Sequence, residues 1–193
     1  MELFTARGRN LERDQDARRY ADANIGFLAL HWLLHSGAVD EIDLFAEQRL
    51  LRNLIYCIAA QGQARFVRDW LYIPHTPKYA RSWVLDDQRV WKASALRHLV
   101  EATTQWQGLE DSLQFFLDTS KFNCSLEKNS LRFTPLKASA VHLYKYLTRP
   151  ATKPVPESLR RAFIGTVGWW LRPSLERRRI TAELWQLSLS PRA

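Results

Sequence analysis

The sequence predicts a predominantly all-α protein, a single-core bundle of seven or eight helices with one short β-hairpin. Apolar residues recur at three- and four-residue spacing along most of the chain, as they do on the buried face of a helix. Residues that typically begin or end helices separate these segments. Of the 193 residues, 46% are apolar and 25% are charged. This composition is typical of folded globular proteins and excludes wholesale disorder.

Four helices are expected in the first half of the chain. The first, from Asn10 to about residue 36, is apolar nearly all round in its second part and should be buried there. Gly62 is expected to end the second helix, and Gly108 the fourth. A loop with Pro74 and Pro77 precedes the fourth helix. The expected ranges are 10–36, 40–61, 63–72 and 86–106.

A shorter helix is expected at 109–119, followed by the hairpin. The segment FNCSLEKNSLRFT, residues 122–134, has alternating apolar residues around a polar centre, which is typical of two short strands and a turn. Thr134 and Pro135 predict a helix start, because a capping hydroxyl precedes a proline at the first helical position. Three further helices are expected at 135–149, 156–172 and 174–187, with RPATKPVP as the linker between the first two.

Positive charge is concentrated at one end of the chain. Residues 1–120 carry 14 Lys and Arg against 16 Asp and Glu, whereas residues 121–193 carry 14 against 4. We therefore divide the chain into a near-neutral helical scaffold, 1–120, and a basic region, 121–193, packed on the same core. This asymmetry indicates a polyanion partner, since each phosphate that Lys or Arg neutralises releases condensed counterions. A solvated basic face is the alternative.

The basic side chains of the second region fall on three expected helices. In 135–149, the stripe that faces away from the core is mainly cationic. Three consecutive arginines in 174–187 fan over about 200°, so at least one must face solvent or a partner. Arginine suits phosphate because its planar fork donates two parallel hydrogen bonds. The candidate nucleic-acid-binding cations are Lys137, Lys145, Arg149, Arg160, Arg161, Arg172, Arg177, Arg178 and Arg179.

Trp169 is a further candidate. It is adjacent to Trp170, and neighbouring residues cannot share one face of a helix. If Trp170 packs inward, Trp169 points away from the core. An outward aromatic ring beside arginines is suited to stacking on the bases of RNA or of a single strand. The alternative is that Trp169 packs under the linker or against another helix.

Two stretches resemble the helical small subunit of Cascade-type CRISPR effector complexes. EQRLLRNLIYCIAAQG, residues 47–62, is similar to the helix of that family in which LLR precedes an apolar run. GWWLRPSLERRRITAELW, residues 168–185, is similar to its C-terminal helices with tryptophan and arginine. The resemblance implies an all-helical subunit whose basic face contacts the nucleic-acid backbone along a ribonucleoprotein.

The motifs of common enzymes are absent or incomplete. His31 and His35 have a spacing that metal ligands use, but HWLLH has Trp where a zincin has Glu, and its apolar flanks favour packed core histidines. The sequence contains neither a glycine-rich phosphate loop nor a GxSxG elbow. Cys57 is expected to be buried and inert, and Cys124 to be exposed. We therefore predict neither an enzyme nor a cofactor or metal site.

The sequence thus predicts a non-enzymatic protein that binds nucleic acid, DNA or RNA, and that could be a subunit of a nucleoprotein complex. The alternative is a protein–protein interaction module or inhibitor that docks an acidic partner, with some of the eight Trp as interface anchors. No apolar run approaches the roughly 18–20 residues that span a bilayer. The first residues lack the apolar core of a signal peptide. We expect no membrane association and a cytoplasmic location.

Overall fold

The computed structural model describes residues 19, 23–36, 48–72, 85–127, 130, 132–149 and 155–189. These residues are predominantly α-helical, as predicted, and no strand occurs among them. The helices are α2 (Ile25–Ser36), α4 (Gln48–Ala60), α5 (Ala64–Tyr72), α6 (Leu85–Trp106), α7 (Leu109–Cys124), α8 (Lys137–Leu147), α9 (Glu157–Gly165), α10 (Val167–Trp170) and α11 (Leu175–Leu189).

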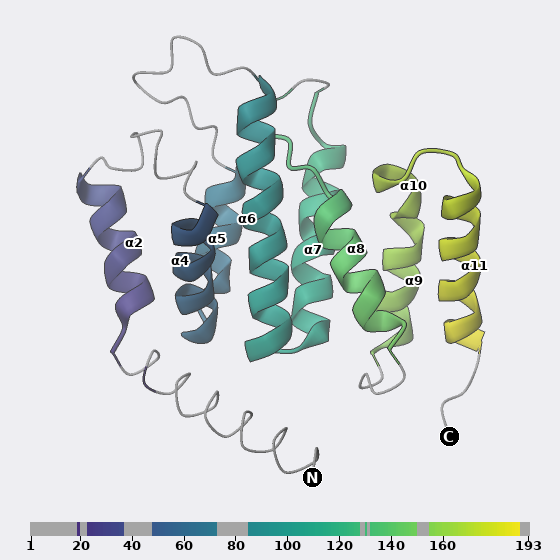
Figure 1. Cartoon of the computed structure of the whole chain (residues 1–193), viewed down its shortest axis with the longest axis horizontal. Helices are drawn as coiled ribbons and strands as arrows, with labels where there is room; N and C mark the ends of the chain where they lie inside the picture. The colour runs from purple at the N-terminus through teal and green to yellow at the C-terminus, as the bar shows by residue number, and fades with distance from the viewer. Residues whose placement is uncertain are drawn as a thin grey trace.

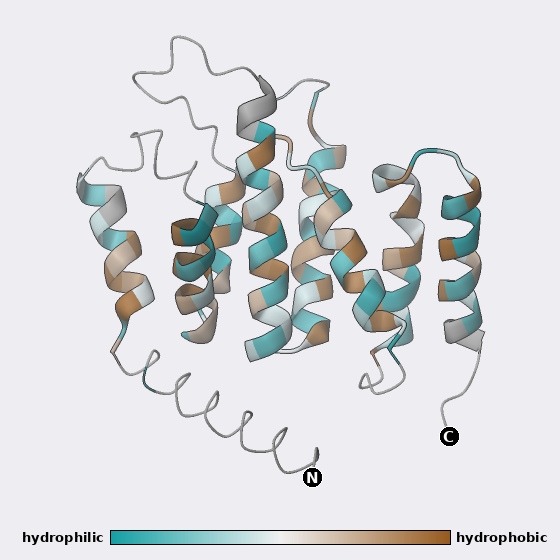
Figure 2. Ribbon diagram, viewed as in Figure 1, coloured by the Kyte–Doolittle hydropathy of each residue, from teal (hydrophilic) through white to brown (hydrophobic). Residues whose placement is uncertain are grey.

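The helices stand side by side, nearly in chain order, from α2 at one end to α11 at the other (Figure 1). The 22-residue helix α6 is central and packs against α4, α5, α7 and α8. At the ends of the row, α2 rests on α4, and α11 rests on α9 and α10. Apolar residues recur along the helices (Figure 2), and a single buried cluster extends from Leu30 of α2 to Leu184 of α11.

The buried faces of the central helices are the ones that the apolar spacing predicts. Each fully buried leucine or isoleucine side chain stabilises the fold by roughly 1.5–3 kcal/mol, so these faces determine how the helices pack. The apolar side chains at three- and four-residue spacing that the structure buries are Leu51, Leu54, Ile55 and Ile58 of α4, Trp91, Ala95 and Leu99 of α6, and Leu136, Ala140, Leu143 and Leu147 at α8.

Two predicted helix stops are confirmed. Gly62 follows α4 with φ of 71°, and its backbone N–H donates to the carbonyl oxygen of Ala59 at 3.0 Å. Gly108 follows α6 with φ of 122°, and its N–H donates to the carbonyl of Thr103 at 2.8 Å. Both positions require the positive φ that glycine adopts without a steric penalty.

The predicted hairpin at 122–134 is wrong for the described residues of that segment. Helix α7 does not end at 119 but continues to Cys124. Its last turn is held by contacts from other parts of the chain. The ring of Phe122 stacks on that of Tyr72 with centroids 4.0 Å apart. The buried side chain of Asn123 exchanges two hydrogen bonds with the backbone of Thr134, at 2.7 and 3.0 Å.

Thr134 does not cap the next helix, contrary to the prediction. Thr134 is fully buried, and its backbone N–H and carbonyl both form hydrogen bonds with the side chain of Asn123. Helix α8 starts at Lys137 with Leu136 as the N-cap residue and no side-chain cap. The hydrogen bonds to Asn123 therefore determine the conformation of Thr134, although the local sequence is typical of a helix cap.

The expected helix at 156–172 is divided at Thr166. The Thr166 hydroxyl donates to the carbonyl of Phe163 at 2.7 Å and accepts from the indole N–H of Trp170 at 3.3 Å. A hydroxyl that bonds the preceding turn competes with the helix ladder. The result is a turn between α9 and the short helix α10, which changes the direction of the chain before α11.

The prediction that the apolar second part of the first helix is buried is wrong for α2. Ile25, Leu28 and Trp32 are 47%, 59% and 62% exposed. Helix α2 lies at the end of the row, so only one side can reach the core. There Gly26 approaches α4 closely: a Cβ atom at Gly26 would lie 2.7 Å from the backbone nitrogen of Ile58.

A charged side chain is fully buried between α5 and α6. Lys92 has no exposed surface, and its Nζ donates to the carbonyl oxygen of Leu71 at 2.7 Å. Burial, with a smaller contribution from the charge of Arg132, lowers the pKa of Lys92 to about 8. The ammonium group lies at the C-terminal end of α5, where unsatisfied carbonyls favour a cation.

Several predictions fall outside the described residues. They are the first helix before residue 23, except residue 19, the start of the second helix before residue 48, the loop with Pro74 and Pro77, residues 150–154 of the linker, and the last four residues of the chain. Among the described helices, none is both long enough and apolar enough to cross a membrane.

Candidate nucleic-acid interface

The first group of candidate cations lies on α8. Lys137, Lys145 and Arg149 are all exposed. Lys145 lies on the side of the helix opposite its buried leucines, Lys137 lies about 90° round the helix from them, and Arg149 lies just beyond the helix end. The guanidinium of Arg149 lies over the ring of Tyr146, 4.6 Å from its centroid. The structure therefore brings these three predicted residues onto one solvent-facing ridge.

A groove between α6 and α8 follows this ridge. One hollow of about 500 Å³ has apolar Ala93 and Val141 in its wall and the cations Arg97, Lys137 and Lys145 around it. A second hollow of about 320 Å³ shares Arg97 with the first and adds Arg52 of α4. The groove thus has cationic side chains from three helices, and two of these helices, α4 and α6, belong to the near-neutral scaffold, residues 1–120.

A carboxylate with two histidines lies in the second hollow. Glu101 Oε1 accepts from Arg97 Nε at 2.8 Å, and the Nδ1 atoms of His98 and His142 lie 3.5 and 3.6 Å from the carboxylate. The hydrogen bonds of His98 and Arg97 lower the pKa of Glu101 to about 2. Burial lowers the pKa of His142 against the opposing attraction of Glu101. The Glu101 carboxylate is therefore ionised and holds Arg97 at the groove.

The candidates on α9 are partly neutralised. Arg161 Nε lies 2.8 Å from Glu157, and Arg160 lies 3.8 Å from the same carboxylate. The side chain of Arg160 is only 11% exposed, whereas that of Arg161 is 65% exposed. Arg160 is therefore poorly placed to reach a ligand, and Arg161 is accessible but already paired.

Helix α11 is tied to α8 through Glu183. Arg179 Nη1 lies 3.3 Å from one carboxylate oxygen of Glu183, one helical turn away. The hydroxyl of Tyr144 on α8 donates to the other oxygen. This contact joins the α8 ridge to the side of α11 that carries Arg179, and it neutralises part of the charge of that arginine.

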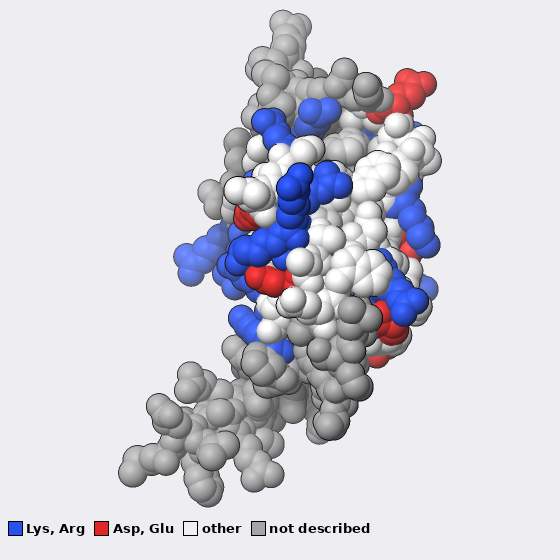
Figure 3. Space-filling model, turned by 90° about the vertical axis from the view of Figure 1, so that its right-hand side faces the viewer, with Lys and Arg blue, Asp and Glu red and all other residues white. Residues whose placement is uncertain are grey.

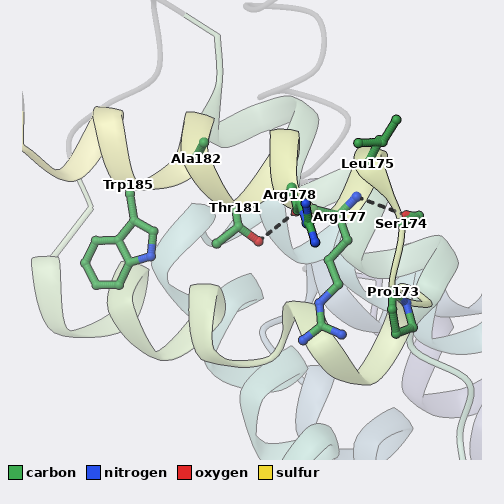
Figure 4. A pocket seen from close by; sticks show the side chains of 8 residues that line it. All are labelled: Pro173, Ser174, Leu175, Arg177, Arg178, Thr181, Ala182 and Trp185. Carbon is green, nitrogen blue, oxygen red and sulfur yellow. Dashed lines mark hydrogen bonds between the residues drawn. The ribbon is translucent and has the colours of Figure 1, made fainter.

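The other three arginines differ in their surroundings. Within the part of the chain that the structure describes, no Asp or Glu lies at ion-pair distance from Arg172, Arg177 or Arg178. Arg172 and Arg178 are exposed, and Arg177 is half-buried. A hollow of about 730 Å³ runs along α11 beside them (Figure 4). It is lined by Pro173, Ser174, Leu175, Arg177, Arg178, Thr181, Ala182 and Trp185.

The two adjacent tryptophans point in different directions. Trp170 is buried at 6% exposure, whereas Trp169 is 62% exposed. Trp169 therefore projects outward in the structure and is not packed under another segment. Trp169 directly follows Gly168, against which the guanidinium of Arg177 lies. An exposed indole and an arginine therefore occur next to each other at the α10–α11 junction.

The histidines of α2 are not core residues, contrary to the prediction. His31 and His35 are both exposed, with their rings stacked 3.8 Å apart. The described residues include no group of three or more His, Cys, Asp or Glu side chains that could hold a metal ion. Cys57 is half-buried, which raises the pKa of its thiol, and Cys124 is exposed.

Sequence reasoning missed the α6 side of the groove and Trp185. Arg97, His98 and Glu101 have the three- and four-residue spacing of neighbours on one helix face, so this part could have been found. The approach of His142 to Glu101 joins helices far apart in the sequence and leaves no local signal.

Comparison with models of known families, with curated proteins and with solved structures found no match to this chain.

Proposed function

We propose that this protein binds nucleic acid without catalysing a reaction, holding the phosphate backbone with Lys and Arg side chains of its basic region. The observation that carries the proposal is the exposure of these cations. Of the nine predicted from the sequence, seven are exposed, Arg177 is half-buried, and the side chain of Arg160 is only 11% exposed. Exposed guanidinium and ammonium groups can exchange condensed counterions for phosphate contacts at little structural cost.

The α6–α8 groove supports the same function. Its cations Arg97, Lys137 and Lys145 come from two packed helices and so form a fixed track rather than a flexible tail. A role as a subunit of a nucleoprotein complex, which the resemblance to Cascade small subunits implies, belongs to the same proposal. Such a subunit would need little sequence discrimination, since phosphate contacts position a protein without reading bases.

The test is the binding of labelled DNA and RNA, followed by fluorescence anisotropy at roughly 50 and 200 mM salt. The double variant Lys145→Ala, Arg149→Ala should bind more weakly and show a shallower dependence of affinity on salt, by roughly one unit of slope for each phosphate that is no longer neutralised. The matched control is Arg49→Ala, Arg65→Ala, which removes two exposed charges from α4 and α5. Absence of binding at the lower salt concentration, or binding indifferent to salt, would contradict the proposal.

A second candidate function is a protein-interaction module, favoured by the exposed apolar side chains of α2. Leu28 and Trp32 are 59% and 62% exposed on the same helix, and exposed aromatic residues are frequent anchors of interfaces. A protein partner that survives nuclease treatment and no longer binds Leu28→Asp would support this candidate. A partner that nuclease treatment removes would support nucleic-acid binding.

A further inference from the structure

We propose that the face formed by α10 and α11 binds a single strand of nucleic acid, with bases stacked on the indoles of Trp169 and Trp185. The arginines Arg172, Arg177 and Arg178 would contact the phosphates of the same strand. This inference rests on the proposed function and narrows it to one class of ligand, an unpaired strand rather than a duplex.

The charges on this face are available. Among the described residues, the basic-region arginines that have carboxylate partners lie on α9 or on the α8 side of α11, beside Glu157 and Glu183. Arg177 and Arg178 line the 730 Å³ hollow, and no described carboxylate neutralises them. The hollow therefore presents uncompensated positive charge to an anionic ligand.

Apolar surface lies beside these charges. Trp169 is 62% exposed, Trp185 is 42% exposed and Leu175 is 83% exposed. Figure 3 looks onto this side of the molecule, where uncharged residues, drawn white, form a stretch of surface with blue Lys and Arg side chains on either side. Each nucleotide carries one flat ring system and one phosphate, so an unpaired strand matches a surface on which indoles and arginines occur together.

The side chains on α11 are arranged along one edge. Arg177, Thr181 and Trp185 follow each other at four-residue spacing and extend from the same edge of the helix (Figure 4). The helical part of the hollow, from Leu175 to Trp185, is about 15 Å long at about 1.5 Å per residue. That length accommodates several nucleotides, since a stacked strand rises about 3.4 Å per nucleotide.

A duplex fits this face less well. The bases of a duplex stack on each other inside the helix, so the two indoles could not reach a base face, and only the arginines would find partners. Stacking on an aromatic side chain contributes about 1–3 kcal/mol per base, and that contribution is available only to unpaired bases. An acidic peptide would satisfy the arginines but supplies no ring to each indole.

The test compares a labelled 12-nucleotide single strand, as oligo-dT and as oligo-U, with a 12-base-pair duplex at low salt. The single strand should bind more tightly. Trp169→Ala and Trp185→Ala should each weaken its binding roughly 5- to 150-fold, without changing the salt slope, because an indole carries no charge. Trp185→Phe should retain most of the affinity. The matched control is Trp32→Ala, which removes an indole as exposed as Trp169 from α2, at the other end of the molecule.

The outcomes separate this inference from the proposed function. If the tryptophan variants bind the strand as Trp32→Ala does, or if the duplex binds as tightly, the inference is wrong while salt-dependent binding preserves the proposed function. If neither strand nor duplex binds, both are wrong. If polyglutamate of similar length binds as tightly and with the same dependence on Trp169 and Trp185, the face takes an acidic peptide and the inference is overturned.

Discussion

The guanidinium group of Arg177 lies against the backbone of Gly168. A Cβ atom at Gly168 would stand 2.6 Å from Nη2 of Arg177 and 3.2 Å from its Cζ, so the arginine occupies space that only glycine leaves open. Arg177 thereby connects α11 to α10, one residue from the exposed Trp169. This packing explains why Arg177 is half-buried while its neighbours Arg178 and Arg179 are exposed.

Gly168→Ala should displace the Arg177 side chain, and Gly165→Ala is the matched control. Nothing lies within 4 Å of a Cβ atom at Gly165, so alanine there should raise the free energy of unfolding by about 0.4–1 kcal/mol. The gain at Gly168 should be smaller or absent, because the arginine must leave its position. Urea unfolding measures both. Equal gains at the two glycines would show that Arg177 does not occupy this space in solution.

Gly26→Ala should destabilise the protein far more than either of these changes. A Cβ atom at Gly26 would lie 2.7 Å from the backbone nitrogen of Ile58 and 2.8 Å from the backbone carbon of Cys57. Backbone atoms cannot rotate away as a guanidinium can, so α2 and α4 must separate. We expect a loss of about 1–3 kcal/mol in the free energy of unfolding, measured by urea titration against Gly165→Ala. An unchanged midpoint would contradict the close approach of the two helices.

The buried helix faces could be predicted from the sequence because helical spacing is a local property. The repeat of Trp91, Ala95 and Leu99 predicts which side of α6 faces the core, and the structure buries all three. The same reasoning could not tell how much of an apolar helix is covered. Leu28 and Trp32 are exposed because α2 stands at the end of the row, a position that no local pattern reveals.

The candidate site was predictable to a similar degree. Charge counting located the cations of α8 to α11, and adjacency alone required Trp169 and Trp170 to point in different directions. The sequence alone does not show for every arginine whether a carboxylate neutralises it. The pairing of Arg161 with Glu157 follows helix spacing, but the hydrogen bond from Tyr144 to Glu183 depends on where α11 lies relative to α8.

Asn123→Ala should be strongly destabilising, although sequence patterning places Asn123 in a short hairpin. Its side-chain amide forms two buried hydrogen bonds with the backbone of Thr134, and their loss leaves a buried N–H and carbonyl without partners. Each such group costs about 1–3 kcal/mol, so we expect a loss of at least about 2 kcal/mol in the free energy of unfolding.

The control for this prediction is Gln114→Ala on the same helix. Gln114 also donates a side-chain hydrogen bond, to Asp118 at 2.8 Å, but it does so on the exposed surface. Its replacement should change stability by less than about 0.5 kcal/mol. If chemical denaturation gives the two variants similar free energies of unfolding, Asn123 does not hold the loop that precedes α8.

Glu101 should make the stability of the protein fall in acid. Its pKa is lowered from 4.5 to about 2 in the folded protein by His98 and Arg97. A carboxyl whose pKa is depressed by folding contributes stability above its unfolded pKa and loses that contribution as the pH falls through its folded pKa. The loss should therefore occur between about pH 5 and pH 2. Burial lowers the pKa of His142 from 6.5, so its protonation adds a loss that begins at higher pH.

Glu101→Gln separates the two contributions. At pH 7 the variant should be less stable than the natural protein, on the order of 2 kcal/mol, since one pKa unit corresponds to about 1.4 kcal/mol and partial exposure reduces the effect. The difference should shrink as the pH is lowered towards 2, because protonation removes the same charge from the natural protein. Urea midpoints measured at intervals from about pH 7 to about pH 2.5 give this comparison. A difference that stays constant over the range would show that the contacts with Arg97 and His98 do not lower the pKa of Glu101 on folding.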